Sequence, residues 1–228
     1  MHYYVITGGP LTAEAVKVIG EGEIIAADAG IDFCMNHGIK PAFAVGDFDS
    51  VSAEALEKVR QSGIPIKTYP VEKDMTDTEI ALSFIPDGNE ITVVCPLTGR
   101  LDHIIANLQI AGTLHADGKD IVLDDGVTQV FFLTDNESLK TDVSRWGDDT
   151  AVSLVPMSYK ESVSGVTTDG LYYPLENGTL EFGKSLSFSN KPVKNASKIL
   201  QDRSPSGCNA QARGRAERRR RIRSASGT

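Results

Sequence analysis

The sequence predicts two domains of different class, an N-terminal α/β domain and a small C-terminal antiparallel β domain. In residues 1–126, short β-branched or apolar runs alternate with stretches of helical periodicity. Runs such as ITVVC at 91–95 are apolar throughout, which is typical of parallel strands covered on both faces. After residue 126 the helical patterns stop, and short β-rich runs separated by turn residues follow. We therefore expect a Rossmann-like parallel sheet followed by a small antiparallel β-sandwich.

The elements of the α/β domain follow one another in strict alternation. Ser52 can cap one helix, which Gly63 ends, and Gly118 ends the last helix. We expect strands at 3–7, 23–27, 42–45, 64–68, 91–95 and 121–123, and helices at 11–19, 31–37, 52–60, from about 76, and at 102–115.

The second domain, residues 127–190, is expected to consist of strands alone. Its β-branched and aromatic runs are separated by turn residues, including the hairpin signal Asn177-Gly178. We expect strands at 128–134, 151–156, 162–167, 171–175, 179–182 and 185–188.

The composition excludes several classes of protein. No apolar stretch approaches the roughly 20 residues that span a bilayer. The first residues show no basic segment followed by a long apolar run, so we expect no signal peptide. The three cysteines are far apart and lack metal-ligand spacing, so we interpret them as reduced thiols of a cytoplasmic protein.

The net charge of −8 combines two different regions. Residues 191–228 carry +9, which leaves −17 on residues 1–190. An acidic body does not favour nucleic-acid binding, which depends on neutralising phosphates. It is suited to a protein that binds divalent cations.

Acidic residues follow three successive strands of the predicted sheet. Asp28 follows EIIAA, Asp47 and Asp49 follow AFAV, and Asp74 and Asp77 follow IPIKT. Ligands of open α/β sheets bind at the carboxyl ends of the strands. Carboxylates that converge there repel one another unless a hard cation neutralises them, and Mg²⁺ prefers such ligands. The three clusters together therefore favour a magnesium site.

Each cluster also has a simpler explanation. An Asp-x-Asp sequence in a loop often serves only the turn. Thr76 and Glu79 form the pattern of a capping box, in which Asp77 would merely interact with the helix dipole. One cluster alone would not outweigh these explanations, but three at successive strand ends do.

A basic residue follows the apolar 91–95 strand. Arg100 lies between that strand and the next helix, where it can contact a phosphate in a bidentate manner. Asp102 is either a site residue or only the N-cap of the helix. The sequence contains no Gly-x-x-x-x-Gly-Lys-Ser/Thr motif, so the nucleotide site is not a P-loop.

Four motifs resemble the thiamine pyrophosphokinase family, and their order covers residues 1–190. They are GDFDS at 46–50, KDMTDTE at 73–79, TGRLDH at 98–103 and SFSN at 187–190, the last resembling the family's thiamine-contacting strand. The resemblance implies an Mg²⁺-dependent enzyme that uses ATP and thiamine as substrates. It also implies a homodimer whose sites lie at the subunit interface. From the composition and charge of the body we expect neither a membrane nor a nucleic-acid partner.

The resemblance assigns roles to individual residues of this chain. Asp47, Asp49 and Asp74 would hold Mg²⁺, with Asp28 nearby, and Arg100 completes the candidate catalytic set.

The remaining candidates are expected to bind the nucleotide or thiamine. Asp77, Thr78 and Asp102 would lie in the nucleotide–substrate cleft with Arg100. Ser189 and Asn190 would contact thiamine.

The expected reaction is an attack of the thiamine hydroxyl on the β-phosphorus of ATP, with AMP as the leaving group. Catalysis of such transfers depends mainly on positioning and charge neutralisation. Arg100 would offset developing charge, and either Asp74 or Asp102 would accept the hydroxyl proton.

The basic tail, residues 191–228, departs from the family pattern. We find no strand alternation in it, and its arginine content differs from that of the body. A nucleic-acid-binding arm is one interpretation, because residues 218–221 are all arginine. We favour a disordered or non-native end, which would leave the β domain without its last strands.

Two other functions compete with the kinase. In a phosphatase of the haloacid-dehalogenase type, Asp47 would be the nucleophile and Asp49 the acid/base, but two strands precede this motif where that class has none. A non-catalytic protein that binds thiamine or nucleotide is the second alternative.

Overall fold

The computed structural model describes residues 1–142, 149–193, 196–201 and 220–221. The chain divides into two compact units, Met1–Phe132 and Leu133–Thr228. No helix in these described ranges is long and apolar enough to cross a membrane.

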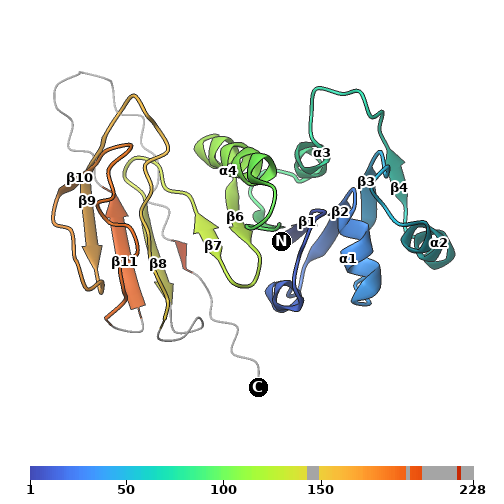
Figure 1. The fold of residues 1–228 in the computed structure, drawn as a ribbon, viewed down its shortest axis with the longest axis horizontal. Coiled ribbons are helices and arrows are strands. Elements are labelled where there is room, and N and C mark those ends of the chain that lie inside the picture. The colour runs from blue at the N-terminus through green and yellow to red at the C-terminus, as the bar shows by residue number, and fades with distance from the viewer. Residues whose placement is uncertain (143–148, 194–195, 202–219, 222–228) are drawn as a thin grey trace. The chain divides into compact units, whose positions relative to one another are not determined.

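The first unit is built around a seven-stranded sheet (Figure 1). The strand order is β4-β3-β2-β1-β5-β6-β7, and β1 to β6 are parallel. Its strands are β1 (His2–Ile6), β2 (Glu23–Ala27), β3 (Phe43–Gly46), β4 (Ile66–Thr68), β5 (Glu90–Val94), β6 (Asp120–Asp124) and β7 (Gln129–Phe131).

Helices cover both faces of this sheet, as the uninterrupted apolar strands predicted. They are the 3₁₀ helix η1 (Ala13–Val18), α1 (Gly30–Asn36), α2 (Ala53–Ser62), α3 (Asp77–Ser83) and α4 (Leu101–Ala116).

Alternate strand residues supply the two halves of the core. Val5 and its neighbours on other strands pack against α3 and α4 through side chains such as Leu82 and Ala111. Ile6 points to the opposite face, where Ile31 of α1 and Val59 of α2 cover it. Figure 1 shows α3 and α4 on one side of the strands and α1 and α2 on the other.

The ends of the helices follow the expected local signals. Ser52 caps α2 by accepting a hydrogen bond from the Ala55 N–H, and Gly63 ends the helix at a φ of 67°. The helix expected at 11–19 is instead the short η1, capped by Thr12. The main prediction for this unit, a parallel α/β sheet, is confirmed.

One strand belongs to a different unit than expected. The 128–134 run was assigned to the β domain, but β7 pairs antiparallel with β6 and forms the edge of the first sheet. The boundary between the two compact units therefore falls after Phe132 in the sequence.

The described strands of the second unit form one five-stranded sheet in the order β10-β9-β11-β8-β12. Neighbours from β10 to β8 are antiparallel, and β12 is parallel to β8. The strands are β8 (Ser138–Asp142), β9 (Val163–Asp169), β10 (Gly178–Leu180), β11 (Ala196–Gln201) and β12 (Arg220–Arg221).

Several strand predictions in this unit were wrong. The runs 151–156, 171–175 and 185–188 contain only isolated bridges, turns or extended loops. Conversely, the tail was expected to hold no strand, but β11 lies between β9 and β8 at the centre of the sheet. A strand in this position is stabilised by hydrogen bonds to both neighbours, which outweigh its weak local pattern.

Candidate active site

Three carboxylates converge at the carboxyl ends of two neighbouring parallel strands. Asp28 directly follows β2, and Asp47 and Asp49 follow β3, which pairs with β2 in parallel. One oxygen from each of the three side chains lies within 4.8 Å of the others. The sheet therefore brings together residues that are about 20 positions apart in the sequence.

Glycine allows the two strand ends to approach this closely. A Cβ at position 46 would lie 3.0 Å from the Asp28 Cα, and Gly46 has a φ of 152° that side chains disfavour. The Asp28 N–H donates to the Val45 carbonyl over 2.8 Å. Asp28 itself has a φ of 45°, which directs the chain sharply from β2 into α1.

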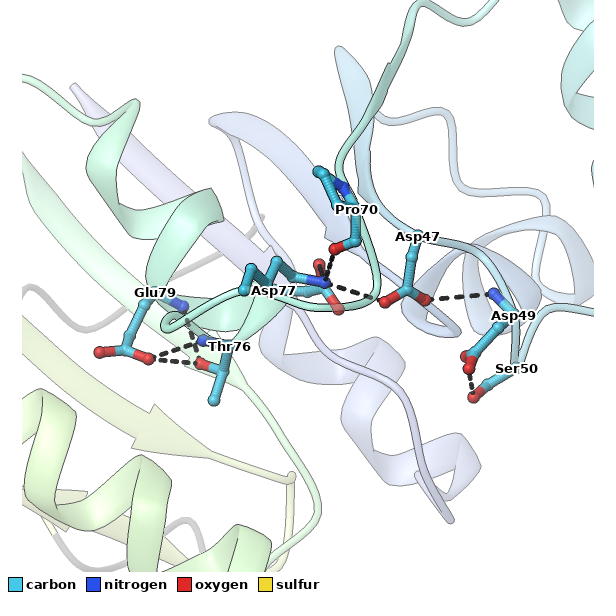
Figure 2. A network of polar contacts seen from close by, with 8 residues as sticks. Asp47, Asp49, Ser50, Pro70, Thr76, Asp77 and Glu79 are labelled. Atoms are coloured by element: carbon cyan, nitrogen blue, oxygen red, sulfur yellow. Dashed lines mark hydrogen bonds and ion pairs between the residues drawn. The ribbon is translucent and has the colours of Figure 1, made fainter.

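The two oxygens of Asp47 have different partners (Figure 2). Oδ1 accepts a hydrogen bond from the Asp49 N–H over 3.2 Å, which is the turn interaction expected for an Asp-x-Asp loop. Oδ2 accepts from Lys73 Nζ over 2.9 Å. Asp49 accepts from the Ser50 hydroxyl over 2.8 Å. The turn interaction and the convergence of carboxylates thus occur in the same loop.

Lys73 also belongs to this site, although no sequence pattern predicted it. Its ammonium donates to Asp47 and to the Pro70 carbonyl, and lies 3.3 Å from Asp77 Oδ1 in an ion pair. The side chain is only 15% exposed. Its motif, KDMTDTE, contains a lysine four residues before Asp77, but no pattern connects that lysine with β3.

The N-terminus of α3 positions Asp77 beside the cluster. Thr76 caps the helix and Glu79 completes a capping box, so this interpretation of the motif is confirmed. Asp77 is the first residue of the helix, and the half-buried Thr78 follows it. The capping role therefore belongs to Thr76 and Glu79, which leaves the Asp77 carboxylate to interact with Lys73.

The carboxylates experience different environments. Burial raises the pKa of Asp28 above its ordinary value, and the neighbouring carboxylates add to the rise. Burial also raises the pKa of Asp77. The hydrogen bond from Lys73 instead lowers the pKa of Asp47 and favours its ionised form.

These residues fit a hard cation. Asp28 Oδ1 is buried and accepts no hydrogen bond from the described part of the chain. A buried carboxylate oxygen without a partner is costly unless it binds a positive ion. Asp74, which the resemblance places among the metal ligands, has an exposed side chain and is not one of the three converging carboxylates.

Arg100 and Asp102 lie at the start of α4 and pair with each other. Arg100 donates from Nη2 to Asp102 Oδ2 over 2.5 Å and from Nε to Oδ1 over 3.2 Å. Their side chains are 71% and 63% exposed. Arg100 occupies the N-cap position of α4, so the interpretation of Asp102 as the N-cap was wrong.

Two family models match the chain in succession. Residues 21–123 match the thiamin pyrophosphokinase catalytic domain, and residues 140–201 match the thiamin pyrophosphokinase vitamin B1 binding domain. The chain belongs to the thiamin pyrophosphokinase family. The match extends to residue 201, which corrects the expectation that the resemblance ends at Asn190.

Individual relatives agree with this membership. The chain is 27% identical over 194 residues to thiamine pyrophosphokinase of Bacillus subtilis, covering 83% of this chain and 88% of that protein. It is 28% identical over 171 residues to thiamine pyrophosphokinase 1 of Oryza sativa, covering 72% of this chain but only 63% of the rice protein.

A solved structure supports the fold of a thiamin pyrophosphokinase. The structure of thiamin pyrophosphokinase from Geobacillus thermodenitrificans aligns with a TM-score of 0.73 and 27% identity. The alignment covers 92% of this chain and all of that chain. The haloacid-dehalogenase alternative is not favoured by these matches.

The thiamine-binding candidates lie in the second unit of this family member. Ser187 and Ser189 have φ values of 71° and 51°, so SFSN is a loop and not the expected strand. The Asn190 side chain is buried, and its hydrogen bonds are to residues of its own unit. Its Oδ1 accepts from the Tyr173 and Lys191 N–H groups, and its Nδ2 donates to the Tyr173 carbonyl. This geometry gives Asn190 a structural role in joining two loops, whereas the Ser189 side chain is exposed.

Proposed function

We propose that this chain transfers the pyrophosphoryl group of ATP to the hydroxyl of thiamine, giving thiamine diphosphate and AMP. The observation that carries the proposal is the convergence of Asp28, Asp47 and Asp49 at adjacent strand ends, in a chain that belongs to the thiamin pyrophosphokinase family. A triphosphate needs such a cation site, because its own negative charge otherwise repels the acidic loop.

We propose that Asp28, Asp47 and Asp49 hold Mg²⁺. The buried Oδ1 of Asp28, which lacks a hydrogen-bond partner among the described residues, supports its inclusion. Bound Mg²⁺ would neutralise phosphate charge and polarise the phosphoryl oxygens. Asp74 is the remaining candidate ligand, and its exposed position on the 69–76 segment suits a contact through water.

The chain's own residues would orient the substrates. Arg100 is exposed at the start of α4 and donates to Asp102 from Nε and Nη2, so the remaining guanidinium N–H groups can contact a phosphate oxygen while the pair with Asp102 stays intact. Asp77 is the first residue of α3 and forms an ion pair with Lys73, and Thr78 follows it in the first turn, so both remain candidates for the nucleotide–substrate cleft. We retain Ser189 as the candidate thiamine contact and assign Asn190 to the architecture of its loop.

Between the two candidate bases, we propose Asp74. Hydrogen bonds from Arg100 lower the pKa of Asp102 to about 2, which makes that carboxylate a poor proton acceptor. Turnover by Asp74→Asn and Asp102→Asn variants tests the choice. A loss confined to the Asp102 variant would reverse the assignment.

The function is tested by product analysis. The purified chain is incubated with Mg²⁺, ATP and thiamine, and AMP and thiamine diphosphate are quantified. Equal amounts of the two products, abolished by EDTA, are expected. Phosphate release that does not require thiamine would indicate the phosphatase alternative, and binding of thiamine or nucleotide without AMP formation would indicate a non-catalytic protein.

We further propose a cytoplasmic homodimer that does not bind nucleic acid. The buried free thiols of Cys34 and Cys95 suit a reducing compartment. The exposed apolar residues of the second unit, including Tyr159, Tyr172 and Phe182, suit an interface between copies. Light scattering of the purified chain measures the assembly state, and a monomer at micromolar concentration would contradict it.

A further inference from the structure

The acidic site contains its own positive group. Lys73 Nζ lies 2.9 Å from Asp47 Oδ2, 3.3 Å from Asp77 Oδ1 and 3.0 Å from the Pro70 carbonyl. Figure 2 shows Asp47 of the β3 loop and Asp77 of the first turn of α3, the two residues whose carboxylates the ammonium contacts. The ammonium contacts two carboxylates of this site, those of Asp47 and Asp77. The Asp28 and Asp49 carboxylates converge with that of Asp47.

We propose that Lys73 is an internal counter-ion that occupies part of the acidic site until a divalent cation binds, and that it thereby weakens cation binding to the nucleotide-free protein. This inference rests on the proposed function, because it concerns the proposed Mg²⁺ site. Lys73 is a positioning residue in this sense, since it acts through Asp47 and Asp77.

The contacts explain why the ammonium and a divalent cation compete. Asp47 Oδ1 accepts a hydrogen bond from the Asp49 N–H, and Asp47 Oδ2 accepts one from the Lys73 ammonium. A divalent cation that binds Oδ2 must approach the ammonium or displace it. Because the Lys73 side chain is only 15% exposed, solvent screens this repulsion weakly.

The same lysine connects the site with a loop. The Tyr69 N–H donates to the Gly46 carbonyl over 3.0 Å at the start of the 69–76 segment. Farther along, Lys73 bonds to Pro70 of its own segment and to Asp47 across the site. Displacement of the ammonium would therefore release one of the segment's contacts with the β3 loop.

The test measures cation affinity directly, without turnover. Metal-stripped, nucleotide-free protein is titrated with Mn²⁺, a hard cation with oxygen preferences like those of Mg²⁺, and free Mn²⁺ is measured by electron paramagnetic resonance. Lys73→Met should bind Mn²⁺ at least about tenfold more tightly than the wild type, because a positive charge 2.9 Å from an oxygen of the proposed ligand Asp47 is removed. Lys73→Arg should retain weak binding.

Lys119→Met is a matched control. Lys119 Nζ also contacts one carboxylate and one carbonyl, Asp87 Oδ1 at 2.7 Å and Ile85 O at 2.9 Å, and is 21% exposed. It precedes β6 and thus lies at the amino ends of the strands, opposite the site. Lys119→Met should leave the Mn²⁺ affinity unchanged, although it changes the net charge by the same amount as Lys73→Met.

Unchanged or weaker Mn²⁺ binding by Lys73→Met, relative to Lys119→Met, would overturn the counter-ion proposal. If circular dichroism shows that Lys73→Met is unfolded, Lys73→Gln removes the charge but keeps hydrogen-bonding atoms, and the same tightening is expected. If the wild type makes thiamine diphosphate and the Mn²⁺ affinity of Lys73→Met equals that of the wild type, only the counter-ion proposal is rejected. A wild type that neither binds Mn²⁺ nor forms product rejects the proposed function as well.

Discussion

Gly30, the first residue of α1, should tolerate no side chain. A Cβ at this position would lie 2.1 Å from the Ile6 carbonyl oxygen and 2.7 Å from its carbon. Ordinary carbon–oxygen contacts are about 3.3 Å or longer, so α1 would have to move by about 1 Å from the end of β1. Ile6 is fully buried, and the contact involves backbone, so no flexible side chain can yield.

The expected cost of Gly30→Ala follows from two opposing contributions. Overpacking of a closely packed region costs about 3 kcal/mol at the upper end of its usual range. Replacing glycine by alanine in a helix returns up to about 1 kcal/mol. We therefore expect the free energy of unfolding to fall by about 2 kcal/mol.

Gly112 of α4 provides the matched comparison. A Cβ there would meet Phe132 Cε1 at 3.4 Å, which is an ordinary contact. Gly112→Ala should thus stabilise the protein by about 0.5–1 kcal/mol. Urea unfolding followed by the helical circular dichroism signal measures both variants, because all helices of the described residues belong to the first unit. Equal stabilities for the two variants would refute the steric argument.

Three further predictions concern the carboxylates and the thiols. Asp47→Asn should reduce thiamine diphosphate formation at least about a hundredfold, equivalent to about 2.7 kcal/mol of transition-state stabilisation, and should weaken Mn²⁺ binding; retained affinity would exclude Asp47 as a ligand. Asp28→Asn should stabilise the metal-free protein at neutral pH: the raised pKa of Asp28 means that its contribution to stability is present in acid and lost as the pH rises through the folded pKa. The unfolding free energy of Asp28→Asn should therefore exceed that of the wild type at pH 7 and not at pH 3. A higher unfolding free energy at both pH values would contradict this cause. Burial raises the pKa values of Cys34 and Cys95 to about 12, so native Cys208→Ser protein should not react with a thiol reagent at pH 8, whereas two thiols should react after denaturation.

The sequence predicted the first unit well because its signals are local and consistent. The apolar run EIIAA corresponds to β2 within its observed bounds, and Ser52 and Gly63 delimit α2 as expected. Parallel strands place their carboxyl ends at one edge of the sheet. The positions of Asp28 and Asp47 after successive strands therefore predicted their proximity without knowledge of the pairing.

The second unit was harder to predict because its strands are short and their pairing is non-local. The 151–156 run has suitable residues, but only Val152 forms a bridge, to Asn190. β11 has a weak pattern and lies in a segment interpreted as disordered or non-native, yet it has neighbours on both sides. Strand formation there depends on partners distant in the sequence, which composition does not reveal.

By itself, the sequence determined the α/β class of the first unit, the family motifs and the clustering of acidic residues at strand ends. These properties depend on periodicity, capping residues and strand direction, all of which are local. Only the tertiary structure decided that Asp28, and not Asp74, joins Asp47 and Asp49, and that Lys73 lies among the carboxylates. The reason is physical: a long side chain on a loop is placed by the charges around it in space, and Lys73 and Asp47 are 26 positions apart in the sequence.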